Sequence, residues 1–339
     1  MSIGTLMDLA LYHPEFGYYM TQNPLGDRAD FVTSPEISQM FAEVLCLWAM
    51  ERYLEFQKPA RLAILELGPG RGLLMSDFLK FAQRFPDFYA SLEIHLIEIS
   101  PTLKNIQQTQ LTHLHQFWHT DIEDAFKKID CLPTLILANE FFDALPLEQY
   151  RQQDHHWQQR YVGLNAQKEL EFCFKDIAPK DLPDEIKSCV WKDNEIVEVN
   201  SNAINIIGKI VKHLRSVFGA ALLIDYGYVT GQGDSLQGIS QHKYVDVLDQ
   251  IGEIDLTAHV NFGHFQKIAG NAGKMITQRD FLFKYGLLDL AQNYGRKTDA
   301  KTRHQIEQQV YKLTSSQEMG TLFKVLELNF SSYKSQKDA

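Results

Sequence analysis

The chain has 339 residues, 45% of them hydrophobic and 22% charged, which is typical of a globular protein with a sizeable core. Its formal net charge of −10 argues against a dedicated nucleic-acid-binding surface, because such a surface needs an excess of lysine and arginine. The four cysteines show no CxxC spacing, which favours reduced thiols over disulfides or a metal site.

No segment has the eighteen or so consecutive apolar residues that a membrane-spanning helix needs. The first residues also lack the basic and apolar regions of a secretory signal peptide. We therefore expect a cytoplasmic protein without a membrane span.

Residues 1–58 are predicted to form an N-terminal arm of helices. Ser2 is a favourable N-cap for the first of them. Further along, Ser34 and Pro35 predict the start of one long helix, because serine favours the N-cap and proline the first helical position. Glu36 in its first turn complements the helix dipole, or it contributes to an active site that this arm covers.

The motif ELGPGRG at 66–72 follows a short apolar run and precedes apolar residues at helical spacing. A strand, a glycine turn and a helix in this order let a nucleotide-like ligand lie against the backbone. A dinucleotide-binding turn reads GxGxxG, whereas this one reads GxGxG, with Leu73 in place of the third glycine. The acid before the turn also suits a ligand that carries an amino-acid ammonium. The motif therefore resembles the first motif of class I S-adenosylmethionine methyltransferases, and we assign the following residues to cofactor binding: Glu66, Gly68, Pro69, Gly70 and Gly72.

Two later strands end in acids that suit a nucleoside. Residues 94–97 predict a buried strand, and Glu98 behind it is placed to accept hydrogen bonds from ribose hydroxyls. Residues 116–119 predict a third strand, and Asp121 follows it where class I methyltransferases have an adenine contact. A solvated acid is the alternative interpretation at both positions.

A fourth predicted strand, residues 134–138, runs into NEFFDALP at 139–146. Buried carboxylates are costly unless they are paired, so these acids indicate a cationic partner. We expect Asn139 to contribute to the cofactor site. Glu140 and Asp143 are expected to meet the sulfonium centre or a cationic substrate nitrogen, with the phenylalanines excluding water.

The first part of the core is thus expected at 59–146, and the pattern then changes. Alternating runs predict the strands of an inserted β-rich subdomain at 147–199. A helical stripe follows, which Gly219 is expected to end. Residues 200–330 are expected to complete the core and to carry a substrate-side insertion, and 331–339 to form a flexible tail. The insertion contains DLTAHV at 255–260, and with it His259, a candidate catalytic residue.

With these motifs in view, the chain resembles the MidA family, the bacterial relatives of a mitochondrial complex I assembly factor that is a protein arginine methyltransferase. The resemblance covers nearly the whole chain. It rests on YHPEFGYYM, DFVTSPEIS, ELGPGRG, NEFFDALP, LLIDYGY, DLTAHV and MGTLFKVLEL, all in the family's order. Two positions depart from the family pattern: Ala29 stands where glycine is usual, and Asn261 where aspartate is usual.

The resemblance implies an α/β class I methyltransferase fold, a Rossmann-like doubly wound sheet with an N-terminal helical arm and a β-rich insertion. It implies S-adenosyl-L-methionine as the cofactor, no metal, and an arginine of a protein such as a complex I core subunit as the substrate. Glu140 and Asp143 would then hold the arginine guanidinium, with Glu36 and His259 completing the catalytic set.

Two alternatives remain beside this interpretation. One is an assembly chaperone for a respiratory complex that keeps the fold with a vestigial methyltransferase site. The other is a nicotinamide-dependent oxidoreductase, which requires a GxGxxG turn that the chain lacks. The sequence does not indicate the oligomeric state.

Overall fold

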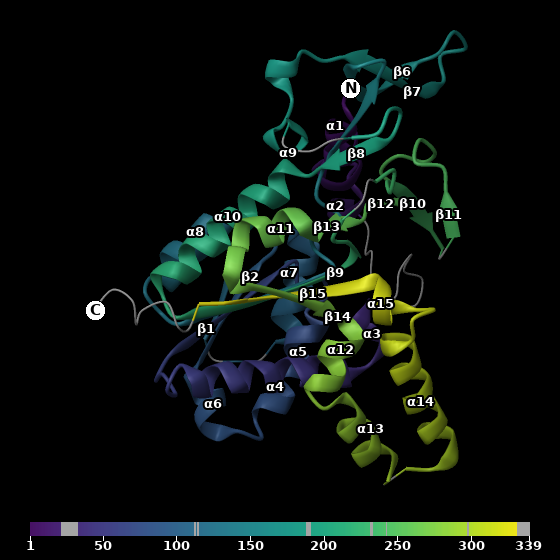
Figure 1. The fold of residues 1–339 in the computed structure, drawn as a ribbon. Coiled ribbons are helices and arrows are strands. Elements are labelled where there is room, and N and C mark those ends of the chain that lie inside the picture. The colour runs from purple at the N-terminus through teal and green to yellow at the C-terminus, as the bar shows by residue number, and fades with distance from the viewer. Residues whose placement is uncertain are drawn as a thin grey trace. The chain divides into compact units, whose positions relative to one another are not determined.

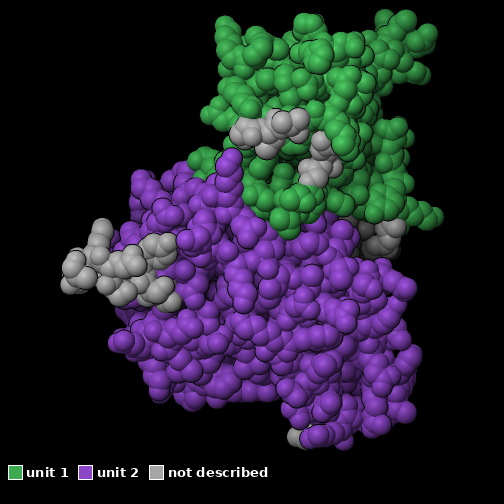
Figure 2. All heavy atoms as spheres, viewed as in Figure 1, with its two compact units in different colours: residues 1–31, 142–207, 228–265 green, residues 32–141, 208–227, 266–339 purple. Residues whose placement is uncertain are grey.

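The computed structural model describes residues 1–21, 33–111, 113, 115–187, 191–230, 233–241, 243–296 and 298–330. Figure 2 colours the two compact units into which the chain divides. Unit 1 comprises residues 1–31, 142–207 and 228–265, and unit 2 comprises residues 32–141, 208–227 and 266–339. The division expected at 58, 146 and 199 stays a prediction about domains. Ala29, Cys189 and the expected tail lie outside the described residues.

Unit 2 contains the central sheet (Figure 1). Its strands are β1 (Leu62–Leu67), β2 (Leu92–Ile97), β3 (Gln116–His119), β4 (Thr134–Asn139), β9 (Gly219–Tyr228), β14 (Gly273–Thr277) and β15 (Phe323–Asn329). They lie in the order β14-β15-β9-β4-β1-β2-β3. The five strands from β9 to β3 are parallel, whereas β15 lies antiparallel to both β9 and β14. The carboxyl ends of β1, β2, β3 and β4 therefore lie at one edge of the sheet.

Helices lie on both faces of this sheet, as a doubly wound α/β fold requires. Those of unit 2 are α3 (Ser34–Ile37), α4 (Gln39–Glu55), α5 (Leu73–Ala82), α6 (Pro86–Ser91), α7 (Pro101–Gln110), α8 (Ile122–Ile129), α12 (Gln278–Lys284), α13 (Leu287–Gly295), α14 (Ala300–Thr314) and α15 (Met319–Leu322). In Figure 1, α4, α5 and α6 cover one face and α8 the other. Two further helices, α10 (Ser201–Ser216) and α11 (Phe262–Ala269), have residues in both units.

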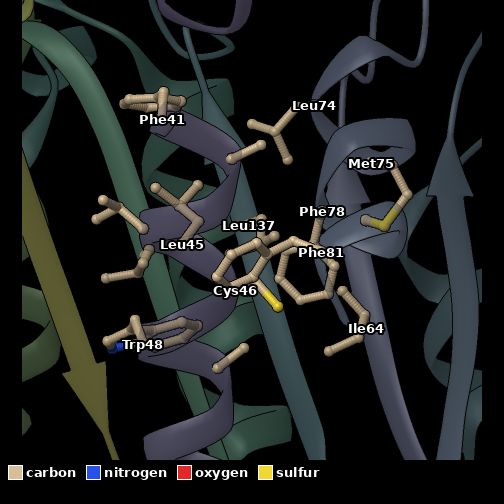
Figure 3. Packing of buried hydrophobic residues seen from close by; sticks show 14 of the residues in the cluster. Phe41, Leu45, Cys46, Trp48, Ile64, Leu74, Met75, Phe78, Phe81 and Leu137 are labelled. Atoms are coloured by element: carbon tan, nitrogen blue, oxygen red, sulfur yellow. The ribbon is translucent and has the colours of Figure 1, made fainter. Parts of the chain in front are cut away.

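The main hydrophobic core lies between α4, α5 and the sheet. Figure 3 shows Cys46 of α4 directed towards Phe78 and Phe81 of α5. Cys46 is a buried free thiol, as the sequence predicted, whereas Cys131 is exposed. Helix α4 is buried on most of its surface, so it is a helix of the core.

The start of this helix also differs from the prediction. The expected single helix is divided into α3 and α4 at Ser38, which has extended φ and ψ of −161° and 133°. The Ser38 side chain accepts a hydrogen bond from the backbone N–H of Met40 at 3.2 Å, so it caps a new helix. Thr33, and not Ser34, is the N-cap of α3, and the Glu36 carboxylate accepts from the Thr33 N–H at 3.3 Å.

The prediction for Gly219 was also wrong. This residue does not end α10 but begins β9, where it pairs with Thr134 of β4. A Cβ atom at this position would lie 2.3 Å from Leu214 Cδ2, so the glycine allows close packing and does not serve as a helix terminator.

Unit 1 combines short helices with two small sheets. Its helices include α1 (Ile3–Tyr12), α2 (Tyr18–Thr21) and α9 (Asp184–Lys187). One sheet has the order β7-β6-β5-β8 and the other the order β11-β10-β12. Their strands are β5 (Glu148–Gln153), β6 (His156–Leu164), β7 (Leu170–Asp176), β8 (Ile196–Val199), β10 (Gln237–Ser240), β11 (Lys243–Val245) and β12 (Asp255–Thr257). Strand β13 (Val260–Asn261) belongs to neither of these two sheets.

The predicted helix cap and the aromatic segment at 12–20 both have structural roles in unit 1. Ser2 Oγ accepts from the Thr5 N–H at 3.2 Å, which confirms Ser2 as the N-cap of α1. Tyr18 is 1% exposed and packs with Leu11 and Leu256 in one cluster. Among the helices that the structure describes, none is long and apolar enough to cross a membrane.

Candidate functional site

The glycine turn after β1 forms the floor of the candidate site in unit 2. Gly68, Gly70 and Gly72 have φ angles of +62°, +54° and +79°. Residues with a side chain adopt such positive φ angles only at a cost in free energy. The Gly72 N–H donates to the Pro69 carbonyl at 2.8 Å and closes the turn. A Cβ atom at Gly68 would lie 2.8 Å from Phe141 Cδ2, so the turn leaves bare backbone beneath a ring. This geometry lets a ligand approach the main chain closely.

Glu66 lies on β1 immediately before the turn and is 4% exposed. Burial raises the pKa of its carboxyl, with a further contribution from the negative charge of Glu98, to about 8. Its Oε2 atom is buried without a hydrogen-bond partner among the described residues. A buried carboxylate oxygen with no partner is rare in folded proteins, and a cationic ligand group satisfies it well.

Glu98 follows β2 and is held by two donors. Its Oε1 accepts from the Ser100 N–H at 2.8 Å, and its Oε2 accepts from Gln107 Nε2 at 2.9 Å. Burial raises the pKa of Glu98, and these hydrogen bonds oppose the shift. A carboxylate has about four lone-pair positions, so capacity remains for ribose hydroxyls.

The end of β4 brings Asn139 and Glu140 to the same edge of the sheet. Glu140 has a φ angle of +50°, a strained conformation of the kind that concentrates at functional sites. Its Oε1 atom accepts from the Ser34 N–H and from Asn139 Nδ2, both at 3.0 Å. The Asn139 Oδ1 atom is buried without a hydrogen-bond partner in the described part of the chain.

Helix α3 lies beside Glu140, and a catalytic role for Glu36 in this helix stays a prediction. Its first residue, Ser34, contacts Glu140 through the backbone N–H. Burial raises the pKa of Glu36, while the Thr33 N–H and the positive charge of Arg71 in the glycine turn lower it. Helix α3 also contacts α5, the helix that follows the glycine turn.

Three further predicted residues are Asp121, Asp143 and His259. Asp121 is exposed and caps α8, where its Oδ1 accepts from the Asp124 N–H at 2.7 Å. Asp143 and His259 belong to unit 1. Asp143 is 7% exposed, and its carbonyl accepts from the Ala258 N–H at 3.0 Å. The functional roles of all three residues stay predictions.

His259 lines a cavity within unit 1. Its backbone N–H donates to Ser235 Oγ at 2.8 Å. Ser235 in turn donates from Oγ to Glu198 Oε2 at 2.6 Å. The cavity is lined by His259 and Asn261 together with Phe142, Leu147, Glu198, Asn200, Ala203, Ile204, Tyr228, Ala258, Val260, His264 and Phe265. Two imidazoles and a buried carboxylate therefore meet a mostly apolar wall.

Sequence reasoning missed Gln107 of α7, which contacts both Glu98 and the glycine turn. The sequence did contain a signal for it: Gln107 follows Leu103 by four residues, which places it on the buried side of its helix. A polar residue in an apolar stripe needs hydrogen-bond partners, and these partners indicate a site.

The donors and acceptors in unit 2 fit an amino-acid nucleoside. Glu66 Oε2 lacks a partner and suits an ammonium, bare backbone lies at the turn, and Glu98 suits a ribose. No cluster of His, Cys, Asp and Glu in the described ranges has the arrangement of a metal site. The groups at the glycine turn and at Glu98 fit S-adenosyl-L-methionine.

Comparison with known proteins agrees with this geometry. A profile of a family described as S-adenosyl-L-methionine-dependent methyltransferases matches residues 44–279. A zebrafish (Danio rerio) relative named protein arginine methyltransferase NDUFAF7, mitochondrial, is 32% identical, over 95% of this chain and 82% of its own. The human protein of that name is 30% identical, over 95% of this chain and 78% of its own.

A solved structure has the same fold. It is a Burkholderia thailandensis protein bound to S-adenosylhomocysteine, and it superposes with a TM-score of 0.82 and 22% identity over 98% of this chain and 88% of that one. At this identity the likeness concerns the fold, which confirms the predicted α/β class I methyltransferase architecture. The glycine turn, the profile match and the relatives lead to one conclusion: the chain belongs to the MidA-like family of S-adenosyl-L-methionine-dependent methyltransferases.

Proposed function

We propose that this methyltransferase modifies an arginine side chain of a protein substrate. The observation that carries the proposal is the likeness, along 95% of the chain, to relatives named protein arginine methyltransferase. The acids at the end of β4 support it, since a guanidinium is the cationic side chain that pairs best with carboxylates.

In this proposal the residues of unit 2 hold the cofactor. Glu66 accepts from the ammonium of its methionine part, and the backbone at Gly68, Pro69, Gly70 and Gly72 lies against that part. Glu98 accepts from the ribose hydroxyls, Asp121 contacts the adenine, and Asn139 offers its partnerless Oδ1 atom. When bound, S-adenosyl-L-methionine supplies an electrophilic methyl group on a sulfonium centre.

The acceptor acids position the substrate and receive a proton. Glu140 is fixed by the Ser34 N–H and by Asn139, so its carboxylate is preorganised before a guanidinium arrives. Arginine stays protonated in proteins, so the proton would leave the reacting nitrogen as the C–N bond forms and the bond between methyl and sulfonium breaks, and Glu140 would accept it. Asp143 provides the second carboxylate, and Glu36 and His259 assist in orienting the substrate.

We further propose a complex I core subunit as the substrate and a cytoplasmic location. The first follows from the family resemblance and the second from the sequence pattern. The curated relatives are named mitochondrial, so the location is a separate claim from the chemistry.

The test is incubation of the protein with methyl-labelled cofactor and a purified complex I core subunit. Wild type should label the subunit. Glu140→Gln should lose most of the labelling while it still binds S-adenosylhomocysteine, and Glu171→Gln, an exposed control on β7, should match wild type. Cofactor binding without any labelled protein would contradict the proposal and favour the chaperone interpretation.

A further inference from the structure

Gln107 is a buried polar residue that connects three parts of the cofactor edge. It lies on α7 with 0% exposure. Its Nε2 atom donates to the Gly70 carbonyl at 2.6 Å and to Glu98 Oε2 at 2.9 Å. Its Oε1 atom accepts from Trp118 Nε1 of β3 at 2.9 Å. One amide thus joins the glycine turn, the end of β2 and the side of β3.

The orientation of this amide is determined by chemistry. An indole N–H only donates, so Trp118 must meet the amide oxygen. The NH₂ group then faces Gly70 O and Glu98 Oε2, and both of these atoms are acceptors. A flipped amide would set its oxygen against a carbonyl and a carboxylate, so a single orientation satisfies all three contacts.

Gly72 allows the glutamine stem to approach the turn. A Cβ atom at Gly72 would lie 3.3 Å from Gln107 Cγ, which is tighter than ordinary packing. The stem is therefore held against the turn while its amide reaches Glu98. With Ser100 N–H on the other oxygen, the Glu98 carboxylate is held at both of its oxygen atoms.

We propose that Gln107 is a positioning residue for cofactor binding: it fixes Glu98 in the rotamer that receives the ribose and fixes the Gly70 peptide beside it. This inference rests on the ribose role of Glu98 proposed above. Gln107 itself does not touch the ribose in this account, so its effect passes through Glu98 and the turn.

The decisive variant is Gln107→Glu, which keeps the shape of the side chain and replaces the donor by a carboxylate. The new carboxyl group would lie beside the Glu98 carboxylate, and two carboxylates this close repel each other, so the pKa of one of them rises. Binding of S-adenosylhomocysteine, measured by calorimetry, should be about 10- to 100-fold weaker than wild type at pH 8, as for loss of a hydrogen bond to a charged group. The ratio to wild type should shrink at pH 6, because the protonated carboxyl can again donate to Glu98.

The matched control is Gln108→Glu, an exposed position on the same helix, which should bind like wild type at both pH values. Unchanged affinity of Gln107→Glu at pH 8 would overturn the proposal. A loss of affinity of equal size at pH 6 and pH 8 would also overturn it, because a purely structural defect does not depend on the charge of the new carboxyl group.

A double-mutant cycle separates this inference from the ribose proposal. Gln107→Leu should weaken binding more in the wild-type background than when Glu98 is already Gln, because coupled residues are not additive. The loss that remains in the second background reports the contact with the Gly70 carbonyl. Equal losses in both backgrounds would assign Gln107 a role independent of Glu98 and overturn the inference. If Glu98→Gln alone leaves the affinity unchanged, the ribose proposal itself fails.

Discussion

At the scale of single residues, the central feature is a carboxyl group that is buried before its ligand arrives. Burial and the neighbouring Glu98 raise the pKa of Glu66 from 4.5 to about 8, so the group is largely protonated at neutral pH. An ammonium beside it favours the charged form and lowers this pKa again. In the proposed cofactor site, ligand binding would therefore be linked to proton release.

We predict that S-adenosylhomocysteine releases close to one proton at pH 7. Calorimetry in buffers of different ionisation enthalpy measures this number directly. Glu66→Gln, which cannot ionise, should bind with no such release, and Glu171→Gln on the exposed face of β7 should behave as wild type. An enthalpy independent of buffer in the wild type would show that Glu66 does not meet the ammonium.

The same residue gives the ligand-free protein a pH dependence. Between pH 4.5 and about 8 the folded state holds a proton that the unfolded state has lost. The free energy of unfolding should therefore fall as the pH rises through this range. Glu66→Gln removes this contribution, so the variant should gain stability over wild type as the pH increases.

At the scale of elements, α4 is joined to β15 by a buried polar cluster. Trp48 Nε1 and Arg52 Nη1 both donate to Glu327 Oε1, at 2.8 and 2.9 Å. Arg52 also pairs with Glu55 at 2.8 Å, whose side chain is 38% exposed. The cluster satisfies polar groups that would otherwise be buried without partners.

Glu327→Leu should cost about 3 kcal/mol of unfolding free energy, because it leaves buried donors without an acceptor. Glu55→Leu, which removes the more exposed partner of the same arginine, should cost less than about 1 kcal/mol. Urea unfolding followed by tryptophan fluorescence compares the two. Equal costs would mean that the buried contact contributes no more than the surface pair.

The glycine turn and α10 provide a contrast between two glycines. Gly68→Ala introduces a Cβ at a φ of +62° and 2.8 Å from Phe141 Cδ2, so it should lower both stability and cofactor affinity. At Gly208 a Cβ would meet nothing within 4 Å, so Gly208→Ala should stabilise α10 by about 0.5–1 kcal/mol and leave affinity unchanged. Thermal unfolding and calorimetry test the pair, and unchanged affinity in Gly68→Ala would contradict the close approach of ligand to the turn.

At the scale of the whole molecule, the sequence predicted the parallel strands because each is a short apolar run ending at a polar residue. It could not order them, since the insertion of β15 between β9 and β14 depends on contacts between distant segments. The bounds of β5 could not be predicted, because Glu148–Gln153 is too polar for its apolar residues to alternate. The break at Ser38 was missed because Pro35 had already marked a helix start.

For the candidate site, too, the sequence predicted some residues and missed others. Glu66, Glu98 and Glu140 could be predicted to lie at one edge of the sheet, because parallel strands bring their carboxyl ends together. Gln107 was missed because it acts through hydrogen bonds to residues far along the chain. The assignment of Asp143 and His259 to unit 1 likewise depends on tertiary contacts.

The central claim is methyl transfer to a protein arginine, and the chemical form of the product tests it most directly. A lysate depleted of endogenous cofactor is incubated with the protein and methyl-labelled S-adenosyl-L-methionine, and the labelled proteins are hydrolysed to amino acids. The account predicts label in N-methylated arginine with wild type, and its loss with Glu140→Gln. Label confined to another amino acid, or to small molecules with none in protein, would contradict it.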